Sequence, residues 1–125
     1  MIKINQFMHA GLVISNLQKS RAFYEGLLGL IPNLKRPEMD FEGVWYDIGH
    51  NQIHLMVVPN PYAGVTRPPH GGRDNHLALA VDDVEPIKAV LEQAGVPYSA
   101  SKSGRAALFC RDPDGNAIEF SAVKF

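Results

Sequence analysis

One pattern occurs twice in this chain, and this repeat constrains the fold more than any other feature. The first copy begins at His9 (HAGLVISNLQKSRAFYEGLLGL) and the second at His76 (HLALAVDDVEPIKAVLEQAGV). In each copy an alternating apolar run passes through a polar capping pair into an amphipathic segment that stops near a glycine, Gly29 or Gly95. This order predicts a strand followed by a helix in both halves.

Strand-like stretches follow each predicted helix. They cover residues 44–48 and 52–58 in the first half, and 106–111 and 116–123 in the second. The ends of the halves align as well, because Asn-Gln-Ile-His-Leu lies opposite Asn-Ala-Ile-Glu-Phe, so that His54 corresponds to Glu119. We therefore predict an α+β fold in which two tandem βαβββ modules form a curved, incompletely closed mixed β-barrel with helices outside.

The length of 125 residues and the hydrophobic content of 46% fit a single domain with one core. We expect the first module to span residues 1–60, a Pro- and Gly-rich connecting loop to span 61–74, and the second module to span 75–125. The net charge of -1, with both signs interspersed, argues against nucleic acid and anionic membranes as partners. No signal peptide or membrane span is visible and Cys110 is the single cysteine, so a cytoplasmic location is expected.

Strand parity predicts a metal site. Side chains alternate between the two faces of a strand, and four polar residues at matched repeat positions, His9, His54, His76 and Glu119, all fall on the less apolar parity. The opposite parity is rich in Leu, Ile, Val and Phe and should pack under the helices. Any one of the four alone would usually be an ordinary surface residue, but the matched set predicts that they converge on one divalent cation.

Three imidazoles and a carboxylate suit several metals. Zinc, nickel, iron, cobalt and manganese all accept such ligands, and the set does not choose among them. A cation with open positions polarises a carbonyl, binds an enediolate or accepts oxygen. His9, His76 and Glu119 alone would also match the facial arrangement of two histidines and a carboxylate.

Nearly the whole chain resembles the vicinal oxygen chelate superfamily, which includes glyoxalase I, extradiol dioxygenases, and fosfomycin and bleomycin resistance proteins. The resemblance is carried by His-Ala-Gly-Leu from His9, Phe-Tyr and Leu-Gly-Leu in the first helical segment, His-Leu-Ala-Leu-Ala-Val from His76, and most specifically Phe-Cys-Arg-Asp-Pro-Asp-Gly-Asn-Ala-Ile-Glu-Phe, which ends at Phe120. It implies the same four metal ligands and a homodimer whose metal sites take residues from both subunits.

The resemblance implies a metal-dependent lyase or isomerase of glyoxalase type, acting on a small oxygen-chelating carbonyl substrate, possibly a thiol adduct. Glu119 is the preferred catalytic base and His54 the second candidate. Authentic glyoxalase I usually has an acidic residue where this chain has His54, which is a departure from the glyoxalase pattern.

Three alternatives remain open. An extradiol-type iron(II) dioxygenase would use the facial triad, although a fourth protein ligand, His54, would occupy a position that catechol and oxygen require. A small-molecule binding or resistance protein without turnover is the second, but such proteins lack the metal ligands. Thiol transfer to an epoxide, as in fosfomycin resistance, is the third.

Arginines in the second half are candidates for binding an anionic substrate: Arg73, Arg105 and Arg111. His50 and His70 lie in turn-like segments and are expected to be exposed. Cys110, in an apolar run, is expected to be a buried small hydrophobe rather than a nucleophile.

Overall fold

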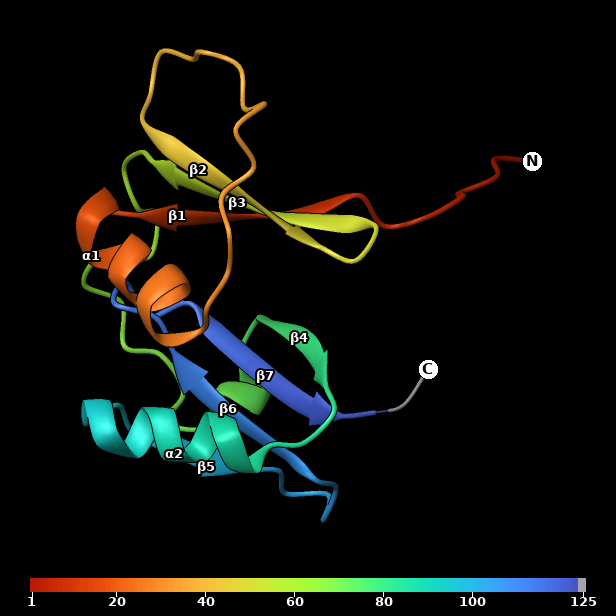
Figure 1. Ribbon diagram of the computed structural model, residues 1–125, viewed down its shortest axis with the longest axis vertical. Coiled ribbons are helices and arrows are strands. Elements are labelled where there is room, and N and C mark those ends of the chain that lie inside the picture. Colours follow the sequence, from red (N-terminus) through yellow and green to blue (C-terminus); the bar gives the residue numbers. More distant parts are fainter. Residues whose placement is uncertain (124–125) are drawn as a thin grey trace.

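The computed structural model describes residues 1–123 and has the predicted α+β class, with each half built around its own mixed sheet (Figure 1). The first half contains β1 (His9–Ile14), α1 (Leu17–Arg21), a π-helical turn η1 (Ala22–Leu27), β2 (Gly43–Ile48) and β3 (Asn51–Val57). Its strand order is β1-β3-β2, with β1 parallel and β2 antiparallel to the central strand.

The second half repeats this plan with one more strand. It contains the short 3-10 helix η2 (Gly71–Arg73), β4 (His76–Val81), α2 (Glu85–Ala94), β5 (Tyr98–Ala100), β6 (Ala107–Arg111) and β7 (Ala117–Ala122). The order is β4-β7-β6-β5, and β4 runs parallel to β7 as β1 does to β3. The two halves therefore share topology as well as sequence pattern.

The first half lacks a full outer strand at the position that β5 holds in the second. Only an isolated bridge between Pro32 and Tyr46 marks it. A proline has no amide hydrogen to donate to a ladder, and Pro37 follows five positions later, so this segment does not build a longer pairing. Within residues 1–123 the two sheets remain separate and no closed barrel forms, in keeping with the open barrel that the repeat predicts.

The expected capping residues mark the start of α1 and the ends of both helical segments, whereas α2 starts after Val84, which makes no side-chain capping hydrogen bond. The side chain of Asn16 accepts a hydrogen bond from the Lys19 amide at 3.0 Å and so caps the start of α1. The helical segments end at Gly29 and Gly95, whose φ angles of 75° and 71° lie in the left-handed region that glycine tolerates best. The repeated glycine thus marks the same structural event in both halves.

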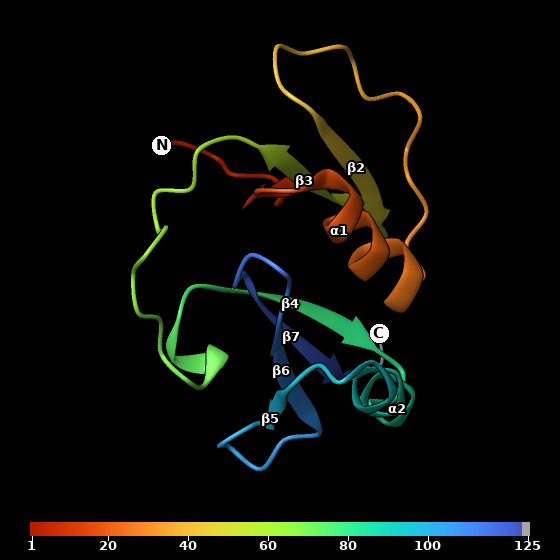
Figure 2. The same ribbon diagram turned by 90° about the vertical axis from the view of Figure 1, so that its left-hand side faces the viewer.

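The apolar parity of both sheets packs under the helices, as predicted. Ile53 and Leu55 of β3, and Ile118 and Phe120 of β7, are at most 3% exposed. Their neighbours on the other parity, including His54 of β3, lie on the opposite face of each sheet. Figure 2 shows α1 and α2 each beside its own sheet. Apolar burial therefore fixes which face each predicted ligand occupies.

A polar contact joins the halves where the most specific sequence segment turns between β6 and β7. The buried carboxylate of Asp112 accepts hydrogen bonds from Tyr24 Oη at 2.7 Å and from the side-chain amide of Asn116. Asn116 also donates to the Val13 carbonyl at 3.0 Å. A single cluster of buried apolar residues includes members of both halves. The halves therefore form one packed unit rather than two independent ones.

Two expectations about the chain's environment can be compared with the structure. No helix within residues 1–123 is long and apolar enough to cross a membrane. Cys110 is free and 3% exposed, and burial raises the pKa of its thiol to about 12. The thiol is therefore protonated at neutral pH and poorly nucleophilic, as its apolar context indicates.

Candidate metal centre

The four predicted metal ligands lie on the faces of the sheets that the helices leave open, and they form two pairs. His9 and His54 come together on the first sheet, and His76 and Glu119 on the second. Within residues 1–123, no three side chains of His, Cys, Asp or Glu gather in a way that could hold a metal ion. One chain thus presents two pairs of candidate ligands and not one complete quartet.

The first pair is part of a stack of three rings. The imidazoles of His9 and His54 lie with centroids 4.0 Å apart, and the indole of Trp45 covers the other side of His54 at 4.1 Å with an interplanar angle of 4°. Trp45 is paired in register with His54 across β2 and β3, which places both side chains on one face. Burial, aided by nearby His9 and Arg36, lowers the pKa of His54. The neutral imidazole that binds metals is therefore favoured.

A chain of hydrogen bonds fixes the tautomer of His54. Its Nε2 lies 2.8 Å from Gln52 Oε1, while the amide nitrogen of Gln52 donates to Asp47 Oδ1 at 2.8 Å. An ionised carboxylate only accepts, so the Gln52 amide must point its nitrogen at Asp47 and its oxygen at His54. His54 therefore carries its proton on Nε2, and in this tautomer Nδ1 keeps the free lone pair.

The second pair brings two acceptors face to face. His76 Nδ1 lies 2.9 Å from the Asp74 carbonyl oxygen, which can only accept, so Nδ1 carries a proton. In the neutral ring Nε2 is then bare, and it lies 3.3 Å from Glu119 Oε1. Two lone pairs at this distance need a positive species between them, either a proton on the ring or a cation. Donors bonded to a tetrahedral ion at about 2.0–2.1 Å are separated by roughly 3.3 Å, so this pair has the spacing of two metal ligands.

Glu119 is held in a nearly closed setting. Its side chain is 6% exposed, and Phe109 faces it across β6 and β7. The ring of Phe109 meets the edge of His76, with centroids 5.3 Å apart. Arg105 Nη2 lies 3.0 Å from Glu119 Oε2 and supplies a positive charge to this carboxylate. The candidate base is therefore oriented from three sides.

The three candidate arginines have different surroundings. Arg105 contacts Glu119, and so lies at the candidate centre. Arg111 donates to Asp74 and to two backbone carbonyls, and thus fastens the loop before β4 to the sheet. Arg73 is exposed at the end of η2. Of the three, Arg105 alone contacts a predicted metal ligand.

Sequence reasoning missed several residues of the site. Strand parity could have identified Gln52 as part of the site, because Gln52 shares a face with His54. Its hydrogen bond to Asp47 could not be predicted in this way, because that bond depends on pairing across strands. His70 was expected to be exposed, but it is half-buried, with Nδ1 2.7 Å from Ser99 Oγ and its ring edge-on to Phe109. A Cβ on Gly72 would lie 2.8 Å from His70 Nε2, so glycine lets the loop pack against this ring. The Gly-Gly sequence was the signal for that close approach.

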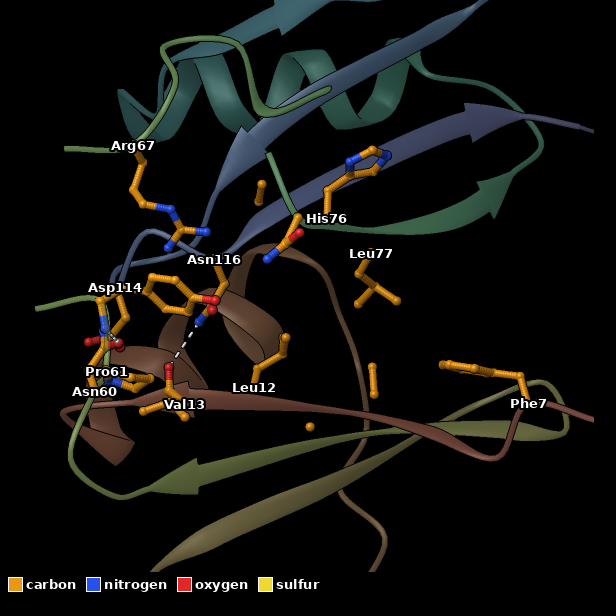
Figure 3. A pocket seen from close by; sticks show the side chains of 15 residues that line it. Phe7, Leu12, Val13, Asn60, Pro61, Arg67, His76, Leu77, Asp114 and Asn116 are labelled. Atoms are coloured by element: carbon orange, nitrogen blue, oxygen red, sulfur yellow. Dashed lines mark hydrogen bonds between the residues drawn. The ribbon is translucent and has the colours of Figure 1, made fainter. Parts of the chain in front are cut away.

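A cavity of about 310 Å³ lies between β1 and β4 (Figure 3). Arg67, Asp114 and Asn116 line its polar end, while Phe7 and Leu77 line its apolar side. Of the four predicted ligands, His76 borders this cavity, whereas His9, His54 and Glu119 do not. The cavity therefore adjoins the second ligand pair at His76 and does not reach the first pair.

Comparison with known proteins agrees with this architecture. The family model described as Glyoxalase/Bleomycin resistance protein/Dioxygenase superfamily matches residues 3–120. The chain belongs to this superfamily. Among curated relatives in it, "Glyoxylase I 4" of Arabidopsis thaliana is 30% identical over 94% of this chain and 71% of its own length. A lactoylglutathione lyase of Haemophilus influenzae is 30% identical, covering 92% and 90%.

The superfamily members that this chain resembles differ in their chemistry. A glutathione transferase, FosA of Serratia marcescens, is 31% identical over 89% of this chain and 76% of its own length. A variant of the fosfomycin resistance protein FosX of Listeria monocytogenes, solved with Mn(II) and a dihydroxypropylphosphonic acid, superposes with a TM-score of 0.75. It is 17% identical and covers 98% of this chain and 95% of its own, so this likeness supports the fold.

Proposed function

We propose that the protein is a metal-dependent lyase or isomerase of glyoxalase type, acting on a small substrate with two neighbouring oxygens. The observation that carries the proposal is the pairing of His76 and Glu119, whose facing atoms lie 3.3 Å apart, which is the spacing of two ligands on one metal ion. Relatives named lactoylglutathione lyase, about 30% identical over nearly the full chain, support the reaction class.

The complete centre would form between two copies of the chain. His9 and His54 of one subunit would meet the second pair, His76 and Glu119, of its partner. The partner would also cover apolar surface next to the first pair, since Phe7 and Met8 are 57% and 69% exposed. A homodimer with two identical centres follows from this exchange.

The donor set fits a divalent ion of the zinc, nickel, iron, cobalt or manganese group. His9, His54 and His76 would supply neutral nitrogen and Glu119 one carboxylate oxygen. When bound, the metal would polarise the substrate carbonyl and stabilise the negative charge that develops on its oxygens. The Asp74 carbonyl and the Gln52 side-chain oxygen accept hydrogen bonds from the N–H groups of His76 and His54, and such bonds orient imidazoles for metal binding.

Glu119 would act as the base in the isomerisation. It would take a proton from the carbon next to the carbonyl and return it to the neighbouring carbon, so that no oxidant or reductant is needed. His54, whose lowered pKa keeps it neutral, is the second candidate for this transfer. Arg105, which lies next to Glu119, is the preferred residue for binding an anionic group of the substrate. Arg73 and Arg111 are the less favoured candidates, because they do not contact a predicted metal ligand.

A subunit-mixing experiment tests the shared centre. One variant carries His9→Ala and His54→Ala, the other His76→Ala and Glu119→Ala, and each alone should bind no divalent metal tightly. Mixed in equal amounts after partial unfolding and refolding, they should regain about a quarter of the wild-type metal content, because random pairing makes about half of the dimers mixed and one of the two centres in a mixed dimer is intact. A His50→Ala variant, altered at an exposed histidine, is the control. Full loss in the mixture would contradict a centre shared between subunits.

Turnover assays on the metal-loaded wild type separate the reaction classes. We expect isomerisation of the adduct of methylglyoxal with glutathione, without oxygen consumption. Ring opening of fosfomycin by glutathione is the second candidate, favoured by the likeness to the glutathione transferase FosA. Oxygen uptake with catechol would instead indicate the dioxygenase, and tight binding of a substrate without turnover would indicate a resistance protein. A cytoplasmic site of action fits the buried, unpaired Cys110.

A further inference from the structure

Arg105 places a positive charge on the oxygen of Glu119 that does not face His76. Its Nη2 lies 3.0 Å from Oε2, while the other carboxylate oxygen faces the bare Nε2 of His76. The Glu119 side chain is only 6% exposed. A carboxylate removed from water to this extent is costly unless it is paired and hydrogen-bonded. The guanidinium of Arg105 provides that pairing.

The exposed position of Arg105 would allow its side chain to move away from Glu119. It lies in the connection between β5 and β6, beside Gly104, and 56% of its side chain is exposed. Its remaining side-chain contact is with Ser103 Oγ at 2.9 Å in the same connection. Arg111, by contrast, is 24% exposed and donates to Asp74 and two carbonyls. Arg105 is thus more exposed than Arg111 and is not tied to the backbone of the sheet as Arg111 is.

We propose that Arg105 is an internal stand-in for the metal: it neutralises Glu119 in the metal-free protein and is exchanged for the cation on loading. This inference rests on the proposed function, since it takes Glu119 to be a metal ligand. Once displaced, the guanidinium stays at the mouth of the centre, where it can hold a carboxylate or phosphonate of the substrate. Metal loading would then switch on the anion site.

Calorimetric titration of the purified, metal-free protein with Zn²⁺, without substrate, tests the exchange. The variants are Arg105→Gln, Arg105→Lys and, as a control for net charge, Arg73→Gln at an exposed arginine. Loss of a competing positive charge at Glu119 should tighten zinc binding of Arg105→Gln by about tenfold. Arg105→Lys and Arg73→Gln should stay within about twofold of wild type.

Thermal unfolding provides a second readout that does not depend on activity. Without metal, Arg105→Gln should melt below Arg73→Gln, because Glu119 loses its partner, and zinc should remove this difference. Unchanged zinc affinity in Arg105→Gln would overturn the exchange, and weaker affinity would show that Arg105 supports Glu119 as a ligand instead. If neither wild type nor Arg105→Gln bound zinc, the metal-dependent function would fail together with this inference. Binding by Arg105→Gln alone would support both.

Discussion

Trp45 lies flat on the imidazole of His54, with ring centroids 4.1 Å apart and planes inclined by 4°. Trp45 is the single tryptophan of the chain. The protein therefore carries one indole fluorophore, and it is stacked on a candidate metal ligand.

Metal binding should change the fluorescence of Trp45. A divalent cation on His54 alters the charge and orientation of the ring stacked on the indole, so titration with Zn²⁺ should shift the emission intensity in a saturable manner. The His54→Ala variant should lose the response, whereas His50→Ala should keep it. An identical response in His54→Ala and wild type would place the metal elsewhere.

Gln52 should matter for metal affinity although it is not a ligand. Gln52→Ala removes the acceptor that fixes the His54 tautomer, and loss of such a partner typically weakens metal binding by about 10- to 100-fold. Gln52→Glu, which keeps an acceptor oxygen, should lose less. Gln93→Ala, at an exposed position of α2, is the matched control for calorimetry. Equal affinities in all three would mean that His54 needs no orienting partner.

Tyr24 should stabilise the contact between the halves. Tyr24→Phe leaves the buried carboxylate of Asp112 without one of its donors, and we expect the free energy of unfolding to fall by about 2 kcal/mol. Tyr98→Phe is the control, because its hydroxyl pairs with an exposed glutamate and its loss should cost well under about 1 kcal/mol. Urea denaturation followed by circular dichroism measures both. A smaller effect at Tyr24 than at Tyr98 would contradict the role of this contact.

Asp74 should make stability depend on pH in the acid range. Arg67, with further help from Arg111, lowers the pKa of Asp74 from 3.8 to about 2. Because the pKa is lower in the folded state, the stabilisation is present above pH 3.8 and is lost as the pH falls toward about 2. Asp74→Asn should lack this part of the acid dependence, while Asp82→Asn, at an exposed aspartate, should keep it. Urea melts at pH 5 and pH 3 measure the difference.

Much of the fold followed from the repeat and from strand parity. Apolar alternation placed Leu55 and Phe120 toward the helices, and both are buried there. The capping role of Asn16 and the helix end at Gly95 were local signals that the structure confirms. The module boundaries at residues 60 and 75 stay a prediction. The buried core and the hydrogen bond between Tyr24 and Asp112 both join residues on either side of these boundaries.

The pairing of the ligands was harder to predict. Parity identifies a face but not which faces meet, so the sequence did not reveal that His9 joins His54 and His76 joins Glu119 as separate pairs. Long-range partners such as Arg105 on Glu119, or His70 on Ser99, depend on how loops return to the sheet. Their sequence signals are too short to specify a contact.

Division of the ligands between two faces of each chain has a consequence for dosage. Under the proposed pairing, a metal centre is complete only in a dimer. At low expression, the concentration of metal-loaded protein would therefore rise with the square of the concentration of the chain. A modest drop in synthesis or an increase in turnover would then silence the protein more steeply than it would a monomer. Metal loading would thereby depend on the concentration of this chain in the cell.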